Sequence, residues 1–223
     1  MAVLRVEYWV IPLANLEQSP NFWPLLDHGE QARALGFKFP ELQQRFVLAR
    51  GVLRQILGVY LQRDPKAIAF HYGDHGKPFV PGISFNLAHT QTLALCAVAP
   101  DCPQGNLGVD IEAKKRRNQV LGLVKRFFTA AEFDFLQQLP ETARQKAFLQ
   151  LWTAKEAYLK GLGLGLQGGL DRVQVQLTPT PQLITLDEQP WSLHLFEPDL
   201  DHFGAIAIDQ TDCQFTNRGR WMI

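Results

Sequence analysis

The sequence is poor in cysteine, has no excess charge of either sign and contains no long hydrophobic run. Its three cysteines, Cys96, Cys102 and Cys213, are odd in number and widely spaced. Such a set forms neither a disulfide framework nor a paired metal site, which is typical of a reducing compartment. No run approaches the roughly 18 apolar residues of a membrane span. We therefore expect a cytoplasmic protein that neither crosses nor binds a membrane.

The charge balance argues against a dedicated nucleic-acid or membrane-surface binder, although it leaves room for a local basic pocket. Lys plus Arg and Asp plus Glu number 22 each, so no overall field attracts nucleic acid or a membrane surface. The apolar segment 1–13 is interrupted by Arg5 and Glu7 and lacks a small-residue cleavage site, which predicts a first strand and not a signal peptide. With 223 residues, 15 Phe and 5 Trp, the chain can bury one large core or two lobes of about 110 residues each.

Hydrophobic periodicity indicates a mixed α+β chain in two halves. Residues 100–106 are the best linker, because prolines and a glycine interrupt both regular periods, so we expect an N-terminal lobe over 1–105 and a C-terminal lobe over 106–223. Similar strand pairs at 84–99 and 191–209 suggest a weak internal duplication with a cleft between the lobes. The expected strands cover 67–72, 84–87, 92–99, 107–112, 171–177, 191–197 and 203–209, and the expected helices cover 29–38, 40–62, 119–127, 130–138 and 141–161.

The segment Gly108-Val-Asp-Ile-Glu112 places two carboxylates on one side of a strand. Residues two apart on a strand share a face, so Asp110 and Glu112 point one way while Val109 and Ile111 are buried on the other. Two carboxylates on a rigid strand suit Mg²⁺, which keeps some waters and completes its shell with phosphate oxygens. The alternative is an amphipathic strand with a solvated acidic face.

A helix over 141–161 carries the third acidic candidate. Trp152, Glu156 and Lys160 are spaced four apart and so share one helix face. Glu156 and Lys160 could also form a simple surface ion pair, which stabilises a helix by only a few tenths of a kcal/mol. The glycine-rich segment 161–165 that follows is either a helix cap or a flap.

Basic residues of the first half suit a phosphate. Lys77 lies in a turn between Gly76 and Pro78, and His89 lies just after the expected strand at 84–87. Arg33 and Arg50 lie on helices of the same half. A turn lysine, a hydrogen-bonded histidine and a solvated helix face explain each residue equally well when it is taken alone.

The order and spacing of these motifs resemble the surfactin-type 4'-phosphopantetheinyl transferase family. The resemblance runs from about residue 30 to residue 170 and includes Arg-Phe-Phe-Thr-Ala-Ala-Glu-Phe at 126–133, between the two acidic motifs. It implies a pseudo-two-fold pair of α/β lobes with coenzyme A bound in the cleft. It also implies that a phosphopantetheine group passes from coenzyme A to a serine of an acyl or peptidyl carrier protein.

The resemblance also implies a role for each candidate residue. Asp110, Glu112 and Glu156 would hold Mg²⁺, with Asp110 close to the coenzyme as well. Lys160, with Lys155 nearby, would contact the pyrophosphate. The remaining implied contacts to coenzyme A are His89 and Arg33 at the 3'-phosphate, Arg50 in the same pocket, and Gly76, Lys77 and Pro78 near the adenosine.

The sequence departs from the family pattern at the phosphate end. Some members have a serine where this chain has Ala88, and the basic pair of other members is reduced, since Glu30 and Gln31 precede Arg33. Glu156 is the expected base for the serine proton. Bound Mg²⁺ lowers a carboxylate pKa, so Glu156 is either loosely coordinated or replaced by a metal-held water.

Carrier proteins tend to present an acidic helix, so a basic and apolar docking patch is expected beside the cleft. Residues 125–128, Lys-Arg-Phe-Phe, are one candidate, and a core helix with two basic ends is the alternative. The carrier served, whether of a fatty-acid, polyketide or peptide synthase, stays open. The length is about twice that of the trimeric holo-carrier synthases, which favours an internally paired monomer.

Two other functions compete with a transferase. A magnesium-dependent pyrophosphatase would use the same carboxylates with water as the nucleophile. A non-catalytic protein that binds coenzyme A would need no such carboxylates, so the intact acidic motifs disfavour it. Incubation with coenzyme A alone separates hydrolysis from transfer, because a transferase needs a carrier.

Overall fold

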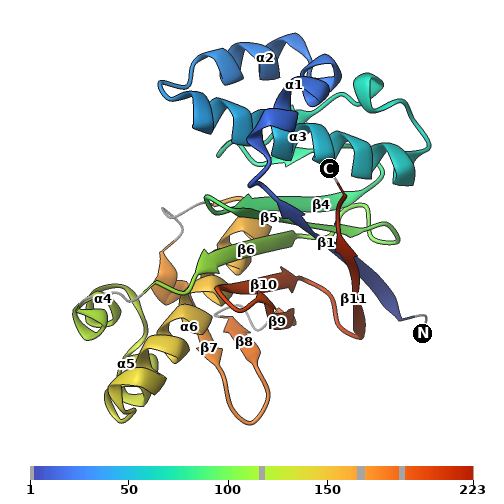
Figure 1. The fold of residues 1–223 in the computed structure, drawn as a ribbon. Helices are drawn as coiled ribbons and strands as arrows, with labels where there is room; N and C mark the ends of the chain where they lie inside the picture. The colour runs from blue at the N-terminus through green and yellow to red at the C-terminus, as the bar shows by residue number, and fades with distance from the viewer. Residues whose placement is uncertain (1–2, 116–118, 165–168, 186–188, 223) are drawn as a thin grey trace.

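The computed structural model describes residues 3–115, 119–164, 169–185 and 189–222 (Figure 1). The chain folds into two α+β lobes, which confirms the predicted fold class. The far end of the expected glycine-rich segment, Gly165, lies outside the described residues. No helix in the described part of the chain is both long enough and apolar enough to cross a membrane.

The first lobe is a four-stranded sheet covered on one face by helices. Its strand order is β11-β1-β5-β4, and α3 packs on it through a cluster that includes Trp9 and Ile11 of β1. Short elements complete the lobe: α1 (Ser19–Phe22), α2 (His28–Leu35), β2 (His71–Tyr72) and β3 (Pro78–Phe79). The main elements are β1 (Leu4–Pro12), α3 (Pro40–Leu61), β4 (Ser84–His89), β5 (Leu93–Ala99) and β11 (Cys213–Arg220).

The second lobe is a three-stranded sheet of order β6-β10-β9, with α6 on its outer face. A separate hairpin, β7 (Val173–Gln176) and β8 (Gln182–Thr185), packs beside α6 (Figure 1). The other elements are β6 (Leu107–Ala113), α4 (Val120–Phe127), α5 (Ala130–Gln137), α6 (Glu141–Leu162), β9 (Ser192–Asp199) and β10 (His202–Ile208).

The two lobes share one topology. In each, a first strand leads to a long helix and then to a hairpin, and the hairpin's second strand pairs with the first strand. The orders β1-β5-β4 and β6-β10-β9 are therefore equivalent, and α3 and α6 are both 22 residues long. This is the topological counterpart of the duplication that the strand pairs suggested.

The inner faces of the two sheets pack against each other. Alternation along β1 sends Val6, Tyr8 and Val10 into this inter-sheet core, and alternation along β6 does the same for Val109 and Ile111. The molecule is thus layered as helix, sheet, sheet and helix, with α3 packed on the outer face of one sheet and α6 on that of the other (Figure 1). The predicted burial of Val109 and Ile111 is confirmed.

Two expectations from the sequence need correction. The last strand, β11, leaves the second half and pairs in parallel with β1, so residues 213–220 belong to the sheet of the first lobe. The expected strand at 67–72 is mostly absent. Pro65–Ala67 forms a 3-10 turn there, and only His71–Tyr72 pairs, because Pro65 fixes the backbone in a helical turn.

Candidate active site

The site is built where β6 lies against α6. With Val109 and Ile111 turned inward, Gly108, Asp110 and Glu112 face the helix. A Cβ at position 108 would lie 2.0 Å from Ala157 O and 2.2 Å from Gly161 N. Only glycine allows this approach, and the approach brings the carboxylates of β6 beside the last turns of α6.

We therefore expect Gly108→Ala to disrupt both the fold and the site. The new methyl group forces the strand and the helix apart, which should cost more than about 3 kcal/mol of unfolding free energy. Gly122→Ala is the matched control, because a Cβ at that exposed helical position meets nothing within 4 Å. Chemical denaturation of both variants checks the expectation. A Gly108→Ala protein as stable as the wild type would contradict it.

A cavity of about 590 Å³ opens over this junction. Its walls come from both lobes, since the β4–β5 loop supplies one side and β6 with α6 supplies the other. It brings together five of the predicted site residues: His89, Asp110, Glu112, Glu156 and Lys160. Its other lining residues are Thr90, Gln91, Thr92, Ile111, Ala113, Lys115 and Trp152.

Asp110 and Lys160 form the central pair of the cavity. Asp110 is 5% exposed, and its Oδ1 lies 2.5 Å from the Lys160 ammonium, which is about one-third exposed. Glu112 accepts a hydrogen bond from Trp152 Nε1 at 3.1 Å. The expected face of α6, with Trp152, Glu156 and Lys160 in line, is therefore turned toward the two strand carboxylates.

Glu156 is the carboxylate with the most perturbed surroundings. It is 8% exposed, and its Oε1 has no hydrogen-bond partner among the described residues. Burial, followed by repulsion from Asp110 and Glu112, raises its pKa to about 7 although the Lys160 cation acts in the opposite direction. A carboxyl that titrates near neutral pH can accept a proton under ordinary conditions.

The donor set suits a hard cation in part. Three carboxylates line one cavity, and the unsatisfied Oε1 of Glu156 offers a ligand atom. In the part of the chain that the structure describes, however, no three Asp, Glu, His or Cys side chains form a ready set of metal ligands. This fits Mg²⁺ better than a metal that needs a full protein cage, because Mg²⁺ takes few carboxylates and adds waters and phosphate oxygens.

His89 lines the cavity on the side of the β4–β5 loop. Burial lowers the pKa of His89, and the nearby charges of Lys160 and Arg45 lower it further. Arg45 of α3 was not among the predicted site residues. Its Nε is buried without a hydrogen-bond partner among the described residues, and it lies outside the residues that line the cavity. Several arginines share α3, so only the fold could show which of them lies near His89.

Lys155 does not join this site, which corrects its predicted contact with the pyrophosphate. It is 0% exposed, and its ammonium bonds to Glu132 at 2.8 Å and to the carbonyl oxygens of Leu170 and Val173. One residue from Glu156 on a helix, it points about 100° away, into the core of the second lobe.

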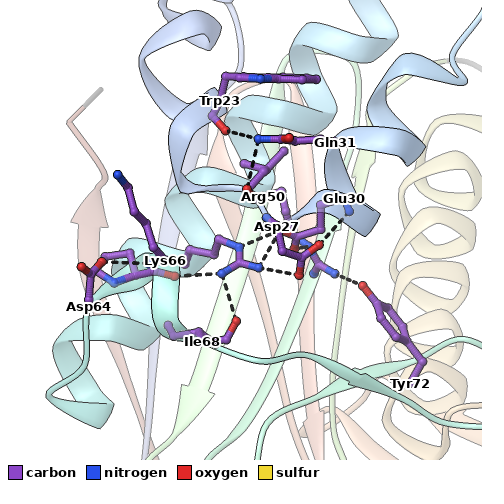
Figure 2. A network of polar contacts seen from close by, with 12 residues as sticks. Trp23, Asp27, Glu30, Gln31, Arg50, Asp64, Lys66, Ile68 and Tyr72 are labelled. Atoms are coloured by element: carbon purple, nitrogen blue, oxygen red, sulfur yellow. Dashed lines mark hydrogen bonds and ion pairs between the residues drawn. The ribbon is translucent and has the colours of Figure 1, made fainter.

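Arg50 is likewise part of the fold and not of the cavity. Figure 2 shows it in a polar network with Glu30 of α2, which it contacts at 2.5 Å, and with the Tyr72 hydroxyl at 2.6 Å. Arg54 bonds to the same glutamate at 2.7 Å. Arg33 is exposed and lies over the Phe46 ring, outside the residues that line the cavity.

The Gly76-Lys77-Pro78 turn lies at a different cavity. Gly76 has a φ of +78°, which explains the glycine. Lys77 and Pro78 line a space of about 780 Å³ with residues of the linker. The Lys77 ammonium donates to Leu107 O at 3.0 Å and to Gly161 O at 2.6 Å, and burial lowers its pKa to about 8. Lys77 thus ties together β6 and α6.

Comparison with known proteins shows the family of this chain. Residues 106–211 match the family model of the 4'-phosphopantetheinyl transferase superfamily. The chain is 39% identical to the 4'-phosphopantetheinyl transferase HetI of Nostoc sp., over 92% of this chain and 87% of that protein. It is 30% identical to a 4'-phosphopantetheinyl transferase of Bacillus subtilis and 27% identical to Sfp of strain 168, with 89% of each relative covered. This chain therefore belongs to the 4'-phosphopantetheinyl transferase family.

Proposed function

We propose that the protein transfers the 4'-phosphopantetheine group of coenzyme A to a serine of an acyl or peptidyl carrier protein. Adenosine 3',5'-bisphosphate is the second product. One observation carries the proposal: a single inter-lobe cavity is lined by Asp110, Glu112 and Glu156 of the second lobe and by His89 of the first. Membership of the transferase family supports the same reaction.

The reaction is a phosphoryl transfer to the serine oxygen. A new P–O bond forms to the phosphorus that bears pantetheine, and the bond from that phosphorus to the bridging oxygen breaks. The bridging oxygen leaves with the bisphosphate. Glu156, which lines the cavity with the two strand carboxylates and is only loosely coordinated in this proposal, accepts the serine proton. Lys160, half-buried beside Asp110, offsets the negative charge that develops on the leaving side.

Asp110, Glu112 and Glu156 would hold the magnesium ion together with phosphate oxygens of the substrate. When bound, the ion neutralises charge on the pyrophosphate. His89 and Arg45 would bind the 3'-phosphate of coenzyme A, since His89 lines the cavity and Arg45 is a cation near enough to act on the pKa of His89. Arg33 remains a proposed contact of the 3'-phosphate, and Gly76, Lys77 and Pro78 remain proposed neighbours of the adenosine.

The shared topology of the lobes supports a further part of the proposal. A chain with two equivalent halves forms by itself the kind of cleft that shorter proteins could form only between subunits. We propose a cytoplasmic monomer whose halves are related by pseudo-two-fold symmetry, divided near residue 105 except for β11.

Intact mass spectrometry of an apo carrier tests the function. With coenzyme A and Mg²⁺, the carrier should gain the mass of one phosphopantetheine group, and a chelator should abolish the gain. Coenzyme A without a carrier should stay intact. Release of adenosine bisphosphate from coenzyme A alone would indicate a pyrophosphatase instead. Binding of coenzyme A without either reaction would indicate a non-catalytic protein.

The candidate docking patch at 125–128 is partly exposed. Lys125, Arg126 and Phe127 face solvent at the end of α4, whereas Phe128 is buried. Two cationic side chains beside an exposed aromatic ring are complementary to an acidic helix of a carrier protein.

Charge reversal of this patch should weaken carrier docking. We expect Lys125→Glu with Arg126→Glu to raise the KM for the carrier about tenfold, because two attractive contacts become repulsive. The KM for coenzyme A should stay unchanged. The matched control reverses Arg63 and Lys66, two exposed charges of the first lobe. An unchanged carrier KM in the first variant would remove this patch from docking.

A further inference from the structure

A histidine of the second lobe that the transfer chemistry does not use contacts two residues of the cavity wall. His202 opens β10 and is 5% exposed. Its Nε2 lies 3.1 Å from Thr92 Oγ1 and 3.5 Å from Thr90 Oγ1. Both threonines line the cavity. The contact therefore joins the β9–β10 turn of one lobe to the β4–β5 loop of the other.

Asp199 fixes the other side of the His202 ring. Its Oδ1 lies 2.8 Å from His202 Nδ1 and also accepts from the backbone N–H of Asp201 at 2.8 Å. Burial would raise the pKa of Asp199, but hydrogen bonds from His202 and Asp201 outweigh it and lower that pKa. An ionised Asp199 places a proton on Nδ1, so in the neutral ring Nε2 accepts a hydrogen bond from the Thr92 hydroxyl.

The β4–β5 loop is held in a compact turn by the side chain of Thr90. Thr90 Oγ1 accepts from the backbone N–H groups of Thr92 at 3.2 Å and Leu93 at 3.1 Å. The Thr90 backbone N–H donates to Leu93 O at 2.8 Å. His89 immediately precedes this compact turn. The place of His89 in the cavity therefore depends on where the whole loop is held.

We infer that the Asp199–His202 pair is a positioning element of the cavity, which clamps the β4–β5 loop to the second lobe through Thr92 and so places His89 for a ligand phosphate. The inference rests on the proposed function, which supplies the ligand. His202 acts through the threonine and the loop, so it is not itself a catalytic residue. It should set the affinity for the 3'-phosphorylated nucleotide and leave the chemistry at Glu156 unaffected.

Two conservative substitutions separate the two hydrogen bonds of the ring. An asparagine amide falls near the position of Nδ1 and keeps the bond to Asp199, whereas a glutamine amide reaches toward Nε2 and can still accept from Thr92. Calorimetry on the full chain would compare adenosine 3',5'-bisphosphate with AMP, which lacks the 3'-phosphate. We expect His202→Asn to reduce the preference for the bisphosphate about five- to tenfold, the loss of one hydrogen bond.

His202→Gln should keep that preference, and the affinity for AMP should be alike in all three proteins. In the transfer assay, His202→Asn should raise the KM for coenzyme A and leave kcat unchanged. Thr92→Val should reproduce the effect of His202→Asn. The double variant should show no further loss of preference, because each substitution removes the same hydrogen bond between His202 and Thr92. If His202 had a purely structural role, the substitution would instead lower the affinities for both nucleotides and kcat together.

His194→Asn is the matched control. His194 also lies at the lobe junction, but its Nε2 is 3.2 Å from the hydroxyl of Tyr8, which does not line the cavity. It should keep the preference for the bisphosphate even where it lowers stability. Loss of the preference in this control would make general lobe packing the cause and would overturn the inference.

The binding and transfer experiments distinguish a failure of the inference about His202 from a failure of the proposed transferase function. A His202→Asn protein with wild-type preference overturns the inference while carrier modification leaves the function standing. A wild type that does not prefer the bisphosphate overturns it as well. If no carrier is modified, the proposed function fails, and the binding series alone decides whether His202 positions a phosphate-binding loop.

Discussion

Glu156→Gln should lower the turnover of carrier modification by at least about 100-fold, the usual contribution of a general base. The amide keeps the size of the side chain but cannot take the serine proton. Coenzyme A affinity should change far less, because Lys160, His89 and Arg45 remain. Steady-state kinetics with the carrier as the varied substrate measure the effect. Equal turnover in the two proteins would remove Glu156 from the chemistry.

The unfolding free energy of the metal-free protein is the control measurement for Glu156→Gln. In the wild type the pKa of Glu156 is raised from 4.5 to about 7 in the folded state, so the folded chain holds an extra proton between those values. The stabilisation of the folded state that this proton supplies is fully present below pH 4.5 and is lost as the pH rises through 7. Relative to the wild type, Glu156→Gln should therefore gain roughly 2 kcal/mol of unfolding free energy between pH 5 and pH 8 in chelator. An equal difference at both pH values would contradict the raised pKa.

Lys155→Met should produce the largest loss of stability. The substitution leaves the Glu132 carboxylate, 2% exposed, without its cation, and it removes two bonds to backbone carbonyls. Breaking a buried pair in this way costs about 3 to 5 kcal/mol. Urea denaturation measures the loss. The folded fraction should retain the wild-type KM for coenzyme A, because Lys155 does not reach the cavity.

The double variant Glu132→Gln with Lys155→Met is the matched control. Removing both charges leaves no unpaired ion in the core, so the pair should recover part of the stability lost by the single variant. A stable Lys155→Met protein with a strongly raised KM for coenzyme A would restore the role that the sequence predicted for this lysine.

Local periodicity predicted much of the fold, and non-local pairing explains what it missed. The apolar stripe of residues 40–62 became α3 with almost the same bounds, and the strand at 107–112 became β6. The strand β11 was not expected. Its sequence, Cys-Gln-Phe-Thr-Asn-Arg-Gly-Arg, has no clear alternation, and it forms a strand because β1 pairs with it across some 200 residues of chain.

The same limit applies to the site. Spacing alone placed Asp110 and Glu112 on one strand face and Glu156 with Lys160 on one helix face, and the fold brings all four to one cavity. Residue type could not separate a ligand-binding cation from a structural one. Lys155 and Arg50 are held by Glu132 and Glu30, partners that lie at least 20 residues away in sequence and are visible only in the fold.

The return of β11 to β1 bears on how the protein folds during synthesis. The first sheet exposes the open edge of β1 until almost the entire chain has left the ribosome, and open apolar edges recruit strands of other molecules. The late strand replaces that edge with a polar one that carries Arg218 and Arg220. Its arrival fastens the two halves together and shields a site of aggregation, so neither half should be soluble when it is produced alone.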